Sequence, residues 1–314
     1  MRKVWLIGAG GMAQDYIRIL ENLKATTTII GRGENSANKF KESTGKNVEI
    51  GGLQSFLSKK PDICSHAIIA VGVEKLFETA KQLLNYNIKN ILIEKPGALF
   101  DKEFEELVNL SELKKANVYI AYNRRYFASV IKAKEIIAQD GGVTSFNFEF
   151  TEWSHIIGPL KKGFGVKEKH FLGNSTHVVD LAFNLGGLPK ELSYYTSGGL
   201  DWHPSASVFC GAGISDSGAL FNYTANWESA GRWGVEVLTK EHKLILRPME
   251  KLQIQKRGTI VENLVEDIDY SLDDNFKPGL YLQTEKFLKN DFENMCSIKE
   301  QNKMVKIYNK MANY

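Results

Sequence analysis

A glycine turn between an apolar strand and an amphipathic helix is the sequence feature that most constrains the fold. Residues 3–7 (KVWLI) predict a buried parallel strand, and residues 8–13 (GAGGMA) follow it directly. Apolar residues then recur at helical spacing from Tyr16 to Leu23. In such a turn the first glycine permits a tight bend, the second lets backbone approach a pyrophosphate, and a small residue allows close helix packing. The segment therefore predicts dinucleotide binding, with a plain tight turn as the alternative.

Strands and helices continue to alternate up to residue 121. Further apolar strands are predicted at 26–30, 66–71, 88–93 and 117–121, with helical patterns between them, including one at 101–115. Alternation of this kind predicts a doubly wound parallel sheet, so we expect an N-terminal Rossmann domain over residues 1–121.

The end of the second predicted strand bears on cofactor choice. An NAD site usually offers a carboxylate there, whereas this chain has Gly31-Arg32-Gly33. A guanidinium suits a phosphate, so we expect NADP rather than NAD, with Ser36 and Lys39 as possible helpers. The alternative is that Arg32 only stacks on the adenine ring.

Glu94-Lys95-Pro96 ends the apolar run of the fourth strand. The carboxyl edge of an α/β sheet is where such folds bind ligands, and partial burial can lower the pKa of a lysine enough for proton transfer. An ordinary surface lysine in a turn is the alternative.

Residues 122–126 (YNRRY) leave the last of these strands at the same edge. Two adjacent arginines cannot face the same way on a regular element. One of Arg124 and Arg125 is expected to contact substrate or cofactor and the other to form a structural ion pair, and the sequence leaves open which. Both could also lie on the surface.

The pattern changes after a helix at about 127–139. Phe146, Phe148 and Phe150 alternate with polar residues, and similar runs lie at 191–196, 207–211, 219–227, 233–239 and 243–246, before helices at about 279–290 and 298–312. We predict a second, α+β domain over residues 122–314, with a large, mostly antiparallel open sheet for substrate binding or oligomerisation.

A helix from Asn174 to Leu181 interrupts this second part. Asn174 or Ser175 is expected to cap its start. His177 would then lie in the first turn, where the positive helix end keeps an imidazole neutral and available as donor or acceptor. A purely structural histidine is the alternative.

Composition excludes several other classes. The chain has 314 residues, 43% hydrophobic and 25% charged, and its net charge of +3 is too small to argue for nucleic acid or an acidic membrane surface. Its three cysteines have no metal-type spacing and are expected to be buried thiols. No apolar run has the length of a membrane helix, so a cytoplasmic protein that binds a small molecule is expected.

The assembled motifs resemble the glucose-fructose oxidoreductase and inositol dehydrogenase (Gfo/Idh/MocA) family over nearly the whole chain. The resemblance rests on the glycine turn, Glu94-Lys95-Pro96, Asn123-Arg124-Arg125 and the His177 helix. It implies NAD(P)-dependent hydride transfer at a sugar or cyclitol carbon, with Lys95 and His177 as the catalytic pair.

One departure from the family pattern concerns the His177 helix. The family commonly reads Asp-x-Gly-x-His there, whereas this chain has Gly173 in place of the aspartate and Ser175 in place of the glycine. Asn174, Lys169 or His170 are candidates to replace the missing carboxylate in a hydrogen-bond network.

Candidate residues follow from these motifs. Those for the cofactor are Gly8, Gly10, Gly11, Met12, Arg32, Val71, Glu94 and Lys95, and those for the substrate are Arg124, Arg125, Asn174, His170 and Trp153. Aromatic faces and forked donors suit polyols, which adds His155, Trp202, His203, Trp227, Arg232 and Trp233, although packing roles are open for each. The lysines of the loop 158–169 could meet a diphosphate or simply be solvated.

The function expected is therefore hydride transfer between a nicotinamide and a nucleotide-linked or free sugar, in surface polysaccharide synthesis or sugar catabolism as the resemblance implies. A non-catalytic cofactor-binding protein and an NAD-dependent glycosidase are the alternatives. Exposed strands in the second domain, together with the resemblance, predict a homo-oligomer, a dimer or a tetramer.

Overall fold

The computed structural model describes residues 2–314, and these form two compact units. The first unit comprises residues 2–122 and 280–305, and the second comprises 123–279 and 306–314. The chain thus leaves the first unit at the end of its fifth strand and returns to it near residue 280. The sequence analysis assigned that returning segment to the second domain. Among the described residues no helix is long and apolar enough to cross a membrane.

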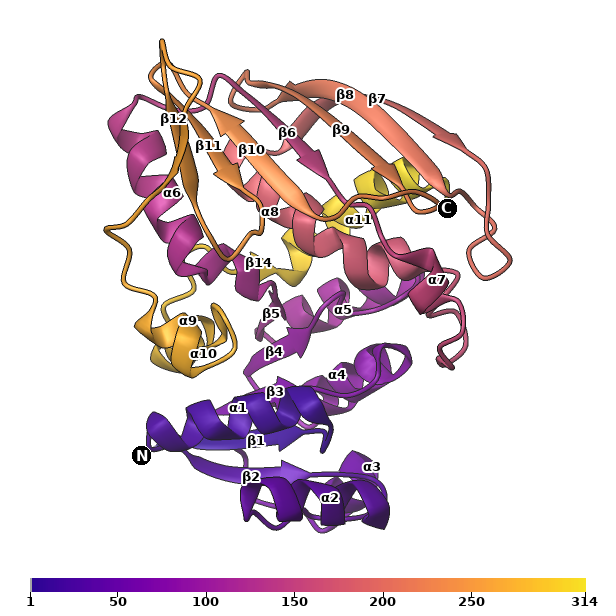
Figure 1. The fold of residues 1–314 in the computed structure, drawn as a ribbon. Coiled ribbons are helices and arrows are strands. Elements are labelled where there is room, and N and C mark those ends of the chain that lie inside the picture. The colour runs from indigo at the N-terminus through magenta and orange to yellow at the C-terminus, as the bar shows by residue number, and fades with distance from the viewer. Residues whose placement is uncertain (1) are drawn as a thin grey trace. The chain divides into compact units, whose positions relative to one another are not determined.

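The first unit is a six-stranded sheet with helices, and the predicted Rossmann architecture is confirmed (Figure 1). Its strands lie in the order β14-β5-β4-β3-β1-β2, and only the short β14 runs antiparallel. The elements are β1 (Lys3–Ile7), α1 (Gly11–Asn22), β2 (Thr26–Ile30), α2 (Glu34–Thr44), α3 (Gly52–Ser58), β3 (His66–Ile69), η1 (Val73–Lys75), α4 (Leu76–Asn85), β4 (Asn90–Glu94), α5 (Asp101–Leu113), β5 (Asn117–Ala121), α10 (Leu280–Lys289) and β14 (Cys296–Ser297).

Strand register brings the ends of the central strands level. Ile7 pairs with Ile30 on one side and with Ile69 on the other. The turns that follow β1, β2 and β3 therefore leave the sheet side by side at its carboxyl edge, which is where open α/β sheets bind ligands. Most residues of these strands are buried, because α1 packs against β1 and β2 and α4 packs against β3 and β4.

The second unit is built on an eight-stranded, mostly antiparallel sheet, as predicted. The strand order is β13-β12-β11-β10-β6-β9-β8-β7, with β6 and β9 the parallel pair. The elements are η2 (Asn123–Tyr126), α6 (Ala128–Gln139), β6 (Ser145–Glu149), α7 (Ser154–Ile157), the π-helical turn η3 (Phe171–Ser175), α8 (Thr176–Gly186), β7 (Pro189–Ser197), β8 (Val208–Ser215), β9 (Leu220–Asn226), β10 (Gly234–Leu238), β11 (His242–Leu246), β12 (Gln253–Lys256), β13 (Glu262–Leu264) and α9 (Ser271–Asn275). Helix α11 (Ile298–Ala312) runs from the first unit into the second.

Helix α8 lies against one face of this sheet, and Figure 1 shows it beneath β6 and β10. The alternating phenylalanines of β6 form the contact: the ring of Phe146 stacks on Phe221 at 5.3 Å and meets Phe183 of α8 edge-on at 6.1 Å. A Cβ at Gly186 would come within 2.3 Å of the Phe146 ring, so glycine is required for the helix to approach this closely. The buried helix fixes the position of the side chains at its start.

Candidate functional site

A cavity of about 730 Å³ lies at the carboxyl edge of the first unit's sheet. Six of the eight candidate cofactor residues line it, namely Gly8, Gly10, Gly11, Met12, Arg32 and Val71. The volume is within the range of cofactor sites, and the turns after β1, β2 and β3 all contribute to the walls. The first unit thus brings most of the predicted cofactor residues together around one space.

The glycines of this turn have different physical roles. Gly8 has a φ of +127°, and a Cβ there would lie 2.2 Å from the Ala70 carbonyl oxygen, so only glycine fits. Cβ atoms at Gly10 and Gly11 would meet nothing within 4 Å, and both residues line the cavity. Backbone at the start of α1 therefore borders open space, as a pyrophosphate requires, because helix starts stabilise phosphate charge. These residues fit a dinucleotide.

Arg32 stands exposed at the cavity wall after β2. Gly33 and Ser36 line the wall beside it, whereas Lys39 is not among the lining residues. The acidic lining residues, Glu74 and Glu78, come from η1 and α4 rather than from the end of β2. After β2 the cavity therefore presents a guanidinium, at the position where an NAD site usually has a carboxylate.

Glu94 and Lys95 do not belong to the described cavity lining. The Glu94 carboxylate accepts a hydrogen bond of 2.8 Å from the buried Tyr16 hydroxyl, which ties the end of β4 to α1. Burial, and then the Glu94 charge, raise the pKa of Tyr16 well above its usual value, so the phenol stays a donor. Gln301 donates to the Pro96 carbonyl at 3.0 Å and holds the turn from its other side, while Lys95 is half-buried.

The His177 helix differs from its predicted form. A π-helical turn, η3, precedes α8 without a break, and neither Asn174 nor Ser175 caps a helix start. The capping prediction is wrong because both side chains bind a carboxylate instead. The helical segment begins at Phe171, so His177 does not lie in its first turn and the helix-end argument for its neutrality no longer applies. His177 is buried, with its ring 6.1 Å from that of Trp233.

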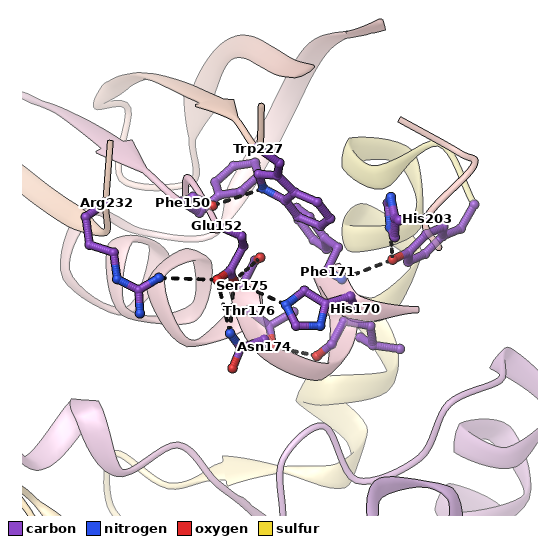
Figure 2. A network of polar contacts seen from close by, with 12 residues as sticks. Phe150, Glu152, His170, Phe171, Asn174, Ser175, Thr176, His203, Trp227 and Arg232 are labelled. Atoms are coloured by element: carbon purple, nitrogen blue, oxygen red, sulfur yellow. Dashed lines mark hydrogen bonds and ion pairs between the residues drawn. The ribbon is translucent and has the colours of Figure 1, made fainter. Parts of the chain in front are cut away.

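Glu152 is the centre of the polar network before α8, and Figure 2 shows its partners turned toward it. Its carboxylate accepts hydrogen bonds from Ser175 Oγ at 2.8 Å and from Asn174 Nδ2 at 3.0 and 3.2 Å. Arg232 Nη1 lies 3.4 Å and His170 Nε2 3.8 Å from it. Glu152 is only 1% exposed, so these donors stabilise a carboxylate that water does not reach.

Sequence analysis missed Glu152, although a signal was present. Phe146, Phe148 and Phe150 occupy every second position, and Glu152 continues the same phase. A carboxylate in the phase of a buried face needs donors around it. The candidates Asn174 and His170 are thus brought together around an acid that the motifs did not include.

The two adjacent arginines, Arg124 and Arg125, make different contacts. Arg125 is 5% exposed and forms a bidentate pair with Asp180 of α8, at 2.8 and 2.6 Å. Arg125 is therefore the arginine of the pair that forms the expected structural ion pair. Arg124 instead lies with its guanidinium carbon 4.9 Å from the centre of the Trp233 ring.

Trp153 and Arg232 form a partly exposed pair near Glu152. The guanidinium carbon of Arg232 lies 4.7 Å from the Trp153 ring and 4.5 Å from the Trp233 ring. Trp153 remains 47% exposed and donates its indole N–H to the Gly231 carbonyl at 3.1 Å. This pair is open to solvent, unlike Trp227, which is 1% exposed.

Other candidates have structural roles. His203 is fully buried between the Ala206 carbonyl and the Tyr314 hydroxyl, both at 2.7 Å, and burial lowers its pKa. In the lysine loop, Lys167 donates to the Gly158 carbonyl and Lys169 lies over the Tyr314 ring. The cysteine prediction is wrong at one position, because Cys210 on the outer part of the sheet is exposed.

Comparison with known proteins defines the class. Residues 2–122 match the model of the oxidoreductase family with an NAD-binding Rossmann fold, GFO_IDH_MocA. The first unit therefore carries the NAD-binding domain of the Gfo/Idh/MocA oxidoreductases, in agreement with the resemblance seen in the sequence. No curated protein matches the sequence significantly.

Solved structures share the fold over nearly the whole chain. UDP-N-acetylglucosamine 3-dehydrogenase GnnA from Acidithiobacillus ferrooxidans is 12% identical with a TM-score of 0.76, covering 99% of this chain and 96% of its own. Levoglucosan dehydrogenase, in complex with NADH and levoglucosan, is 16% identical with a TM-score of 0.78 at the same coverage. A dehydrogenase (MviM) from Clostridium difficile is 19% identical with a TM-score of 0.78, covering 99% of both chains. At these identities the likeness shows the fold.

Proposed function

We propose that this protein is an NAD(P)-dependent oxidoreductase that interconverts a hydroxyl and a carbonyl group on a nucleotide-linked or free sugar or cyclitol. The observation that carries the proposal is the 730 Å³ cavity at the glycine turn, in a unit that matches an NAD-binding oxidoreductase family. Two of the similar folds are named as sugar dehydrogenases, which supports a sugar substrate.

The cofactor proposal is NADP, with NAD as the alternative. Backbone at Gly10 and Gly11 would hold the pyrophosphate, and Arg32 with Ser36 would hold the adenosine phosphate. The absence of an acidic lining residue after β2 supports this choice, because a carboxylate there would repel the phosphate.

Proton transfer is assigned to Lys95 and His177. Bound NAD(P) supplies the hydride acceptor or donor. On oxidation Lys95 or His177 accepts the proton of the sugar hydroxyl, and on reduction the same group returns it. A Lys95 ammonium would also stabilise the negative charge that develops on the oxygen.

The test is a fluorescence titration of the purified protein with NADPH and with NADH. We expect tighter NADPH binding in the wild type, and an Arg32→Ala protein that loses this preference by about tenfold or more. Lys39→Ala is the matched control, because Lys39 is an exposed cation on α2 outside the cavity lining. If neither nucleotide binds, the redox proposal is refuted; if NADH binds more tightly and Arg32→Ala has no effect, the NADP assignment is refuted.

A further inference from the structure

We propose that Arg232 and Trp153 form a subsite in the second unit for the nucleoside diphosphate part of a nucleotide-linked sugar. This inference rests on the proposed function and narrows its substrate class. It assigns the diphosphate to the Arg232 guanidinium and the nucleoside to the neighbouring hollow that Trp153 lines.

Arg232 is held in place through both its backbone and its guanidinium. Its backbone N–H donates to Glu149 at 3.1 Å, Nη1 lies 3.4 Å from the buried Glu152 carboxylate, and two indole rings lie within 4.7 Å of its central carbon. An arginine loses much side-chain entropy when it binds an anion in solution, and these contacts remove most of that cost beforehand. Arg232 is thus organised before a ligand arrives.

The same guanidinium retains capacity for a ligand. Its side chain is 46% exposed, and its ionic contact with Glu152 is long at 3.4 Å. The Glu152 carboxylate already accepts from Asn174 and Ser175, so it needs little from the arginine. Five N–H groups in a planar fork then leave donors for a phosphate, which guanidinium binds in bidentate fashion.

A second positive charge near the Trp233 ring also favours binding of an anion. The Arg124 guanidinium carbon lies 4.9 Å from the Trp233 ring that Arg232 also contacts, although the two residues are more than 100 positions apart in sequence. The nearby Glu149 is paired with Arg247 at 2.9 Å. A diphosphate bound at Arg232 would therefore lie in a positively charged neighbourhood, whereas a neutral free sugar would not use that charge.

Trp153 also lines a hollow of about 510 Å³, and Arg232 is not among the lining residues of that hollow. Its lining includes Trp153, His155, Glu228 and Ser229. The half-exposed Trp153 ring offers a face for a nucleobase, and the polar side chains suit ribose hydroxyls. The Glu228 carboxylate repels phosphate from this hollow, which orients the ligand with its diphosphate toward Arg232.

The experiment is isothermal titration of the intact chain with UDP, uridine and inorganic pyrophosphate. We expect UDP to bind at least about tenfold more weakly to Arg232→Gln and to Trp153→Ala than to wild type. The Trp153 variant removes one ring that contacts Arg232 but none of the hydrogen-bond donors to Glu152. Arg257→Gln is the matched control, since Arg257 is an exposed arginine of the same unit, and it should bind UDP like wild type. Uridine should bind to wild type and to Arg232→Gln with equal affinity, because it carries no phosphate.

Three results would overturn the subsite. If UDP binds equally to wild type and to Arg232→Gln, Arg232 does not contact the diphosphate. If pyrophosphate binds as tightly as UDP, the nucleoside does not contribute to binding. Loss of UDP binding in Arg32→Ala, but not in Arg232→Gln, places UDP in the cofactor cavity. The titration with NADPH and NADH is an independent measurement. The oxidoreductase proposal therefore stands even if UDP does not bind at Arg232, and the UDP result stands even if neither NADPH nor NADH binds.

Discussion

Replacing Asp180 by alanine should destabilise the second unit strongly. The side chains of Asp180 and Arg125 are 3% and 5% exposed and share two hydrogen bonds of 2.6 and 2.8 Å, so the variant removes a carboxylate that pairs with a buried guanidinium. Removing one partner of such a pair costs about 3–5 kcal/mol. With a urea slope of about 2 kcal/mol per molar, the unfolding midpoint should fall by roughly 2 M.

Tryptophan fluorescence during urea unfolding is a suitable assay, because four of the five tryptophans lie in the second unit. Asp267→Ala is the matched control: its carboxylate pairs with Lys132 at 2.7 Å but is 73% exposed, so solvent replaces the lost contact and the midpoint should not move measurably. A double replacement, Arg125→Met with Asp180→Leu, should recover much of the lost stability. A midpoint for Asp180→Ala that matches the Asp267→Ala control would refute this reasoning.

Three further predictions follow from the site. Gly8→Ala should destabilise the first unit, because its Cβ would lie 2.2 Å from the Ala70 oxygen, whereas Gly10→Ala should keep its unfolding midpoint and lose NADPH affinity in a fluorescence titration. Equal unfolding midpoints for the two variants would contradict this. Burial lowers the pKa of His203 below its ordinary 6.5, so the unfolded chain binds the proton first and stability should fall as pH drops below about 6.5. Urea unfolding at several pH values should show a flatter dependence in His203→Gln, and an unchanged slope would contradict the assignment. Lys95→Ala should bind NADPH normally but reduce turnover of a sugar substrate by at least about a hundredfold in a steady-state assay, and near wild-type turnover would remove Lys95 from proton transfer.

The first unit was largely predictable because of the way its sheet is buried. Strands of such a sheet are rich in apolar and β-branched residues, and those at Lys3–Ile7, Thr26–Ile30 and Asn117–Ala121 were predicted with their observed bounds. A glycine that a tight turn requires for steric reasons, such as Gly8, could also be predicted from the sequence. The two-residue β14 is too short for any periodic signal.

The second unit was less predictable because its decisive contacts join distant residues. Strands β12 and β13 were missed, since the edge strand β13 is exposed along its length and shows no apolar alternation. Glu152 binds partners 22 and 23 positions later, and Arg125 meets Asp180 across 55 positions. Local patterns predict which elements form, but a polar network depends on how those elements pack.

The π-helical turn at Phe171–Ser175 has a consequence for how this segment tolerates changes in length. A π turn accommodates one more residue than a regular α-helical turn, so deleting one residue there would leave an unbroken α-helix. Each residue of an α-helix turns the chain by about 100°, so deleting a residue before Asn174 would rotate His170, which precedes the turn, relative to Asn174 and Ser175. These three side chains could then not all face Glu152. The extra residue thus sets the angular relation between the histidine before the turn and the two side chains that bind the carboxylate.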